Sequence, residues 1–309
     1  MQMFPYIALV LSQVGITLKM YAMKMCGKRA GGAFNSVCIN TLRAAICLAV
    51  SILVWLIAGG EGTTWLGHLI ILLSGLGTAV NLFTWILATR AVSLTLLEIT
   101  CMIGSMLVPM ALAPHLFGGE QVALHQWLGG VLVLIGAVLF IQKDTDGVRD
   151  GTPFYKAMIT VGCALSVTAA TLGKKLYSVH IEAKGLGSAE YFTFMSFVVV
   201  VAFFAILFAV FYQKERRMLR STGAADARVE LPYRRVWHLV LLAALSLYAC
   251  ELLTVYANRL PAAVYLPLSK GLNIGCTFLL DVLVFKDKVN ARKLIALATV
   301  MLAVVIVNL

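Results

Sequence analysis

Residues 189–212 read AEYFTFMSFVVVVAFFAILFAVFY, and Glu190 is the only charged residue among them. A helix needs ~20 residues to cross a ~30 Å hydrocarbon layer, so this run is long enough to span a membrane. Nine further hydrophobic segments of similar length fill most of the chain. The ten predicted segments are 3–24, 34–58, 65–89, 91–117, 125–142, 153–178, 189–212, 236–257, 260–284 and 290–309.

The composition indicates a membrane protein. The chain has 309 residues, of which 61% are hydrophobic and 13% charged, and its mean hydropathy is +0.92. These values exclude a soluble domain and a disordered chain. Because the edges of an open sheet would leave unpaired backbone groups in lipid, the segments must be helices. The sequence therefore predicts an all-α integral membrane protein with ten transmembrane helices.

The second half of the chain echoes the first. Residues 88–94 (ATRAVSL) align without gaps to residues 257–263 (ANRLPAA), and each stretch ends one helix, turns at an Arg and starts the next helix. Five is an odd number, so the second unit must enter the membrane from the opposite side. We therefore expect two inverted five-helix repeats, residues 1–148 and 149–309, with sites near the midplane between them.

Small residues inside the segments are typical of close helix contact. They are Gly75 and Gly77 in the third segment and Gly129, Gly130 and Gly136 in the fifth. We expect these glycines to serve packing rather than direct function.

The basic residues gather on one side of the predicted topology. If the termini lie outside, the loops on the other side hold 18 of the 25 Lys and Arg, and the outer loops hold four. This bias predicts a cytoplasmic basic side, with residues 213–235 as a basic cytoplasmic loop and both termini outside. The net charge of +11 is then an orientation signal, supported by anionic membrane lipid, and no nucleic-acid partner is expected.

Several stretches resemble the drug/metabolite transporter superfamily, in particular its ten-helix EamA-type branch. They are Arg43 inside the second segment, the small-residue turn and Pro-containing helix at 88–109, and FGGE at 117–120 followed by QWLGGVLVLIG at 126–136. The resemblance covers nearly the whole chain and implies a transporter fold, while leaving the substrate open. The chain departs from the family in having no Lys or Arg in its loop at 57–62 and in its predicted orientation.

Ionisable residues inside membrane spans are default candidates for function. With ~1.5 Å of rise per residue, Glu98 lies roughly 10–12 Å from the cytoplasmic face and Lys270 roughly 15 Å from the outer face. In the resembling family their two helices line the central cavity. We expect Glu98 and Lys270 to face one cavity, as a substrate site or as a structural ion pair between the halves.

Glu251 is the candidate for proton coupling. Tyr248 lies three residues before it on the same helix face, and Tyr256 is close in sequence. Burial beside phenols favours the protonated carboxyl group, which suits proton coupling. The alternative is that Glu251 is the carboxylate partner of a nearby Arg or Lys.

Further polar and aromatic residues complete the predicted substrate site. Asn81 and Trp85 share one helix face and could stack on a ring or hold an ammonium group. The remaining candidate ligands are Tyr248, Asn273, Tyr265 and Gln13.

Other intramembrane charges are expected to be structural. Arg43 should pair with helix-end carbonyls or an acidic side chain rather than with substrate. Lys19, Lys174 and Lys175 should reach the membrane interface by extending their side chains along the helix.

The sequence predicts a secondary transporter of a small polar or zwitterionic metabolite, such as an amino acid or amine, working by alternating access, with proton coupling as the candidate energy source. A lipid-linked sugar or lipid flippase and a non-transporting accessory membrane protein are the alternatives. We expect no enzyme, because no His pair at metal spacing, no DxxxD-type acidic motif and no nucleophile elbow occurs. No Walker A loop occurs either, so ATP is not the expected energy source. No cofactor or metal is expected. The expected location is the cell membrane, of bacterial inner-membrane type, as a monomer or homodimer.

Overall fold

The computed structural model describes residues 3–30, 32–91, 100–140, 152–221, 231–284 and 291–308. These residues are almost entirely helical and contain no strand. The first half contains α1 (Phe4–Arg29), α2 (Ala33–Ile57), α3 (Trp65–Ala91), the π-helical turn η1 (Ile103–Leu107), α5 (Val108–Leu116) and α6 (Leu124–Phe140). The second half contains α7 (Pro153–His180), the short η2 (Glu182–Lys184), α8 (Ala189–Ser221), α9 (Tyr233–Ala257), α10 (Ala262–Leu283) and α11 (Ala291–Val307).

All ten predicted segments fall on helices over their described residues. Seven of the described helices are long and apolar enough to cross a membrane. Residues 100–116 and 124–139 form shorter apolar helices, and α11 has 17 residues. Many large apolar side chains on the outside of the bundle are exposed, as a hydrocarbon surrounding requires. The length and apolar composition of its helices therefore identify the chain as a multi-pass membrane protein.

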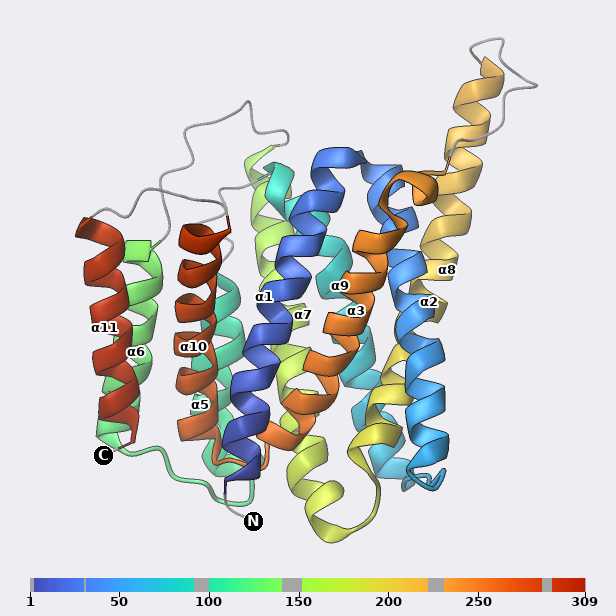
Figure 1. Cartoon of the computed structure of the whole chain (residues 1–309). Helices are drawn as coiled ribbons and strands as arrows, with labels where there is room; N and C mark the ends of the chain where they lie inside the picture. Colours follow the sequence, from blue (N-terminus) through green and yellow to red (C-terminus); the bar gives the residue numbers. More distant parts are fainter. Residues whose placement is uncertain are drawn as a thin grey trace.

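The helices run up and down, and both termini lie at the same end of the bundle (Figure 1). Turn residues set this course. Gly118 and Gly119, for example, adopt φ of 71° and 83°, a conformation that glycine reaches without steric cost. They turn the chain after α5 and place Glu120 at the end of the bundle that holds the termini.

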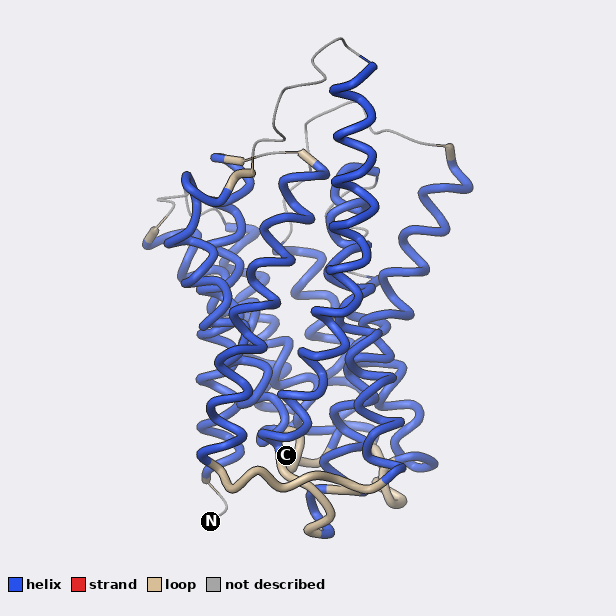
Figure 2. The backbone as a smooth tube through the Cα atoms, turned by 90° about the vertical axis from the view of Figure 1, so that its right-hand side faces the viewer, coloured by secondary structure: helices blue, strands red, loops and turns tan. Residues whose placement is uncertain are grey.

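Four helix pairs dominate the packing: α1 with α9, α3 with α7, α6 with α11, and α2 with α8. The α6–α11 pair stands to one side of the bundle, next to α10 (Figure 1). The helix α8 is 33 residues long, and its C-terminal turns project beyond the other helices at the end opposite the termini (Figure 2).

Glycines let the paired helices approach closely, as predicted. A Cβ on Gly77 would lie 2.6 Å from the Ala170 backbone nitrogen, so α3 and α7 are in backbone contact there. Gly75 meets Val199 on α8, and Gly129 and Gly136 face α11 in the same way. Gly130 would make only ordinary contacts, so it is less constrained than its neighbour.

Candidate functional site

An ion pair lies inside the bundle, between α7 and α9. The Lys174 Nζ is 2.5 Å from Glu251 Oε2, and the two side chains are 13% and 19% exposed. Each residue lies six positions before the end of its helix, which places both about 9 Å along the axis from the end that holds the termini. Removing either charge would leave the other buried without a partner, which is costly in a low dielectric.

The predicted extension of Lys174 to the membrane interface is therefore wrong. Its ammonium group turns inward because a carboxylate lies within direct reach, and an ion pair replaces the water that the interface would supply. Of the two interpretations of Glu251, the geometry shows the ion-pair partner. A role in proton coupling stays a prediction.

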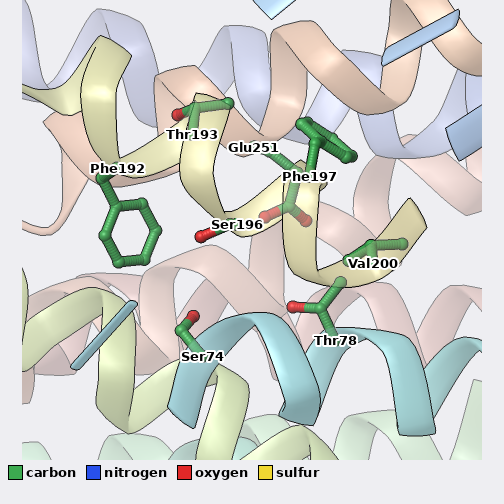
Figure 3. A pocket seen from close by; sticks show the side chains of 8 residues that line it. All are labelled: Ser74, Thr78, Phe192, Thr193, Ser196, Phe197, Val200 and Glu251. Carbon is green, nitrogen blue, oxygen red and sulfur yellow. The ribbon is translucent and has the colours of Figure 1, made fainter. Parts of the chain in front are cut away.

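A small cavity adjoins Glu251 (Figure 3). Its volume is about 10 Å³, roughly the room for one water molecule. The carboxylate of Glu251 points into the space between the hydroxyls of Ser196 and Thr78. The lining residues are Ser74 and Thr78 of α3, Phe192, Thr193, Ser196, Phe197 and Val200 of α8, and Glu251 of α9.

Some hydroxyl groups at this cavity are hydrogen-bonded to other described residues, and one buried hydroxyl is not. Ser74 donates to the Ala170 carbonyl and Thr193 to the Ala189 carbonyl. The buried Ser196 Oγ has no hydrogen-bond partner among the described residues. A buried unsatisfied hydroxyl is uncommon in native structures, and here it offers one hydrogen bond to a small guest beside the Lys174–Glu251 pair.

Tyr248 lies beside this site, as predicted from its spacing to Glu251. It is buried, and its ring centroid is 6.4 Å from that of Phe197, which lines the cavity. Its hydroxyl has no partner among the described residues. Tyr256, the other nearby phenol, instead donates to Glu190 at the start of α8, so it takes no part in the ion pair.

Arg43 lies deep in the bundle on α2, with only 3% of its surface exposed. The expectation that it pairs with helix-end carbonyls or a carboxylate is not met among the described residues. Its electrostatic neighbours are the thiols of Cys47, Cys250 and Cys26, and then Glu251. No salt bridge or hydrogen bond joins its guanidinium to another described residue, since Glu251 is engaged with Lys174.

A second buried lysine ties loops together at the end that holds the termini. Lys175 is 1% exposed, so its ammonium group meets loop residues at this end of the bundle rather than water. Its Nζ lies 2.9 Å from Glu120 Oε1 and donates to the carbonyls of Leu260 at 2.6 Å and Asn258 at 3.1 Å. These acceptors replace water and satisfy the ammonium group inside the protein.

Glu120 completes this tie, because its second oxygen accepts from the Ala262 backbone N–H at 2.6 Å. Ala262 is the first residue of α10, where a carboxylate also interacts favourably with the helix dipole. We call the contacts among Glu120, Lys175 and the 258–262 turn the loop tie. It joins the turn after α5 in the first half to α7 and the α9–α10 turn in the second.

A more exposed ion pair flanks the loop tie. Arg259 Nη2 donates to Glu182 Oε1 at 2.7 Å, and its guanidinium lies 5.0 Å from the centre of the Tyr256 ring. The hydrogen bond that Arg259 donates to the Glu182 carboxylate raises the pKa of Arg259 above its usual value. Polar contacts thus link the loops of the two halves at this end of the bundle.

The expected pair of Glu98 and Lys270 cannot be described as a pair. Glu98 falls within 92–99, outside the described residues. Lys270 is half-buried on α10 and interacts with other parts of the chain. The pair stays a prediction.

Asn81 and Trp85 are not among the residues that line the Glu251 cavity. The Asn81 amide contacts Cys163 Sγ on α7 at 3.6 Å, and Trp85 packs beside Cys163 and Cys101. The predicted helix face therefore meets α7 and the helix that begins at residue 100.

The other predicted ligands gather around α10. Gln13 of α1 donates to Ser269 at 3.1 Å, and both are buried. Tyr265 is 5% exposed within the largest apolar cluster, and Asn273 accepts from Thr277 at 3.4 Å. Lys19 is half-buried on α1 and interacts electrostatically with Cys250, so it also faces α9.

Sequence reasoning missed Lys174 as the partner of Glu251 and the loop tie made by Lys175 and Glu120. A signal for both was present, because Lys174 and Lys175 interrupt an apolar segment together. Two adjacent lysines point in different directions on a helix, and each therefore needs its own partner if the helix is surrounded.

Comparison with known proteins establishes the fold alone. No family model matches the chain, and no curated protein matches it. A solved structure, described only as the crystal structure of a protein, matches with a TM-score of 0.71 at 15% sequence identity. The match covers 98% of each chain, so the whole helical arrangement is shared.

Proposed function

We propose that this chain is a secondary transporter that moves a small polar or zwitterionic solute across the cell membrane by alternating access. The observation that carries the proposal is the Lys174–Glu251 pair beside a small cavity inside the helical bundle. Intramembrane ionisable groups are costly to keep, and they mark solute and ion pathways in membrane proteins.

Ten crossings in two inverted repeats are part of the same proposal. The first repeat would be α1, α2, α3, the helix at 100–116 and α6, and the second α7 to α11. If each helix is replaced by its counterpart in the other repeat, the α1–α9 contact becomes the α7–α3 contact, and the α2–α9 contact becomes the α8–α3 contact. All four contacts occur. By the same replacement, the α1–α10 contact becomes a contact of α7 with η1 and α5, and this contact also occurs. This exchangeable packing supports a pseudo-two-fold relation, as in transporters that rock one half against the other.

The closed end of the bundle supports alternating access. The loop tie joins the two proposed repeats at the end that holds the termini, and the cavity beside Glu251 has room for about one water molecule. A transporter that is closed on one side has this arrangement. The resemblance to the EamA-type transporters, which rests on the residues quoted above, favours the same function and stays a proposal.

A solute or a proton would act on the ion pair. The ammonium group of a zwitterion can replace Lys174 at Glu251, and protonation of Glu251 would release Lys174 in the same way. Either event changes which groups are paired between α7 and α9. Under this proposal, solute binding and proton binding compete at one site.

Reconstituted protein tests this proposal. A thermal-shift screen of purified protein against amino acids, amines, sugars and nucleotides identifies a solute, since a ligand stabilises the state that it binds. The labelled solute is then followed in proteoliposomes. Glu251→Gln should abolish accumulation against a gradient and retain exchange if Glu251 carries the proton. The exposed Glu61→Gln is the matched control and should change neither.

Loss of both activities in a folded Glu251→Gln protein would make Glu251 a solute ligand rather than a proton carrier. No uptake of any solute by wild-type proteoliposomes would contradict the transport function.

A further inference from the structure

We propose that Arg43 binds an anionic group, a carboxylate or a phosphate, on the transported solute. The inference rests on the proposed transport function and narrows the class of solute. It follows from a buried guanidinium that the described residues leave without an anion.

The position of Arg43 makes its charge costly. Arg43 is the eleventh residue of α2, about 15 Å along the helix axis from Ala33, and therefore near the middle of a ~30 Å hydrocarbon layer. It is 3% exposed. A charged group this far from water needs a counter-charge or several hydrogen bonds.

The helices around Arg43 supply almost no acid. Residues 1–60 contain no Asp or Glu, so α1 and α2 have none, and α3 has none. The only acid on α9 is Glu251, which Lys174 already holds at 2.5 Å. On α8, Glu190 in the first turn accepts from Tyr256, and Glu215 lies beyond the apolar run, near the opposite end.

The ionisable groups that act most strongly on the Arg43 charge are thiols. Cys47, Cys250 and Cys26 lie on α2, α9 and α1, and all three are buried. A protonated thiol is only a weak hydrogen-bond acceptor and cannot balance a full positive charge. Lys19 and Lys174 also act on the thiol of Cys250, so cations outnumber Glu251 around this residue.

The missing partner has a definite chemistry. A guanidinium presents a planar set of N–H donors that fits two oxygens of a carboxylate or phosphate. An amine or a neutral sugar offers no such charge. A zwitterion suits both groups, with its carboxylate on Arg43 and its ammonium group competing with Lys174 for Glu251. The same anionic oxygens occur on lipid headgroups, and the test separates these two sources.

The stability of the ligand-free protein gives the first readout. Delipidated protein in neutral detergent is heated, and unfolding is followed by tryptophan fluorescence. Because Arg43→Gln removes an unbalanced buried charge, we expect its Tm to rise by about 2–4 °C. The matched control is Arg259→Gln, which breaks the Arg259–Glu182 pair and should lower Tm. A fall in Tm for Arg43→Gln would show that Arg43 is a structural residue and would overturn the proposal.

Ligand response gives the second readout. Butyrate, γ-aminobutyrate and inorganic phosphate are compared with butylamine and with phosphatidylglycerol micelles. We expect at least one of the free anions to raise the Tm of wild type and of Arg259→Gln, and Arg43→Gln to lose that rise. Arg43→Lys should keep a smaller rise, since lysine holds an anion as a point charge only.

Each other outcome has a definite meaning. If only butylamine raises the Tm, or if no anion raises it, the proposal of an anion site at Arg43 is overturned. The transport proposal is not affected by that result. If only phosphatidylglycerol raises the Tm, Arg43 binds a lipid headgroup, and the proposal that it binds the transported solute is overturned. Anion binding that depends on Arg43, in a protein that moves no solute in proteoliposomes, would sustain this inference while the transport proposal fails.

Discussion

Lys174 and Lys175 are neighbours in the chain, yet their ammonium groups meet different partners. Lys174 faces the carboxylate of Glu251 inside the bundle, and Lys175 faces Glu120 and two loop carbonyls. Successive residues on a helix differ by about 100° in direction, so one dipeptide serves two sites. A shift or rotation of α7 would therefore act on the ion pair and on the loop tie together.

Removing one charge of the Lys174–Glu251 pair should lower the free energy of unfolding more than removing both charges. Lys174→Met leaves a carboxylate buried without a partner, at a cost of about 3 kcal/mol, the lower end for buried pairs because both side chains retain some exposure. Lys174→Met with Glu251→Gln should recover most of that loss. Thermal unfolding of the three proteins in one detergent measures the difference. Equal losses for the single and the double variant would show that the two charges do not interact.

Residue roles were harder to predict than residue depth. The sequence places Glu251 and Arg43 inside spans, and both lie within long apolar helices of the structure. Which charges pair depends on helix rotation and on neighbours far away in the chain. A pattern of apolar residues does not specify these, because charged residues inside a span are too few to define a face.

At the scale of helices, close packing between α3 and α7 depends on glycine. Gly77→Ala would place a methyl group 2.6 Å from the Ala170 backbone nitrogen, so the helices must separate, at a cost of about 1–3 kcal/mol. Gly162 is also helical, on α7, and has nothing within 4 Å of an added Cβ. Gly162→Ala should stabilise by about 0.5–1 kcal/mol through backbone entropy. Thermal unfolding of both variants checks the contrast, and a Gly77→Ala protein as stable as wild type would contradict it.

The loop tie should hold the end that carries the termini closed. Glu120→Gln weakens the bond to Lys175 and to the α10 N-terminus, so a cysteine at Ser196 should become more reactive to an impermeant thiol reagent. The measurement uses a cysteine-free background with Ser196→Cys, compared with the same protein carrying Glu61→Gln. An unchanged labelling rate with Glu120→Gln would show that the tie does not control access.

Helix positions were predictable from the sequence for a simple reason. Lipid requires that each crossing segment satisfy its own backbone, so long apolar runs and helices coincide. Helix ends are harder to predict: α8 continues through residues 213–221, where the sequence predicts a basic loop. Polar residues such as Lys214 and Glu215 extend a helix into water as readily as they form a loop.

At the scale of the whole molecule, the basic residues of α8 and the two termini lie at opposite ends of the bundle (Figure 1). The termini share one end of the bundle (Figure 1), and the C-terminal turns of α8, with Lys214, Arg216, Arg217 and Arg220, project from the other. Basic residues resist transfer across the membrane during insertion. We therefore predict that the basic end of α8 is cytoplasmic and that both termini are outside.

Two single cysteines test this orientation in intact cells. The described structure places Ser221 at the exposed end of α8 and Asn308 at the exposed end of α11. The seven native cysteines are replaced first, since all are free thiols. An impermeant reagent should label Asn308→Cys in intact cells and should label Ser221→Cys only after the membrane is opened. The reverse pattern would turn the protein over in the membrane. It would then place the loop tie on the cytoplasmic side, so that the closed end of this structure would face the cell interior.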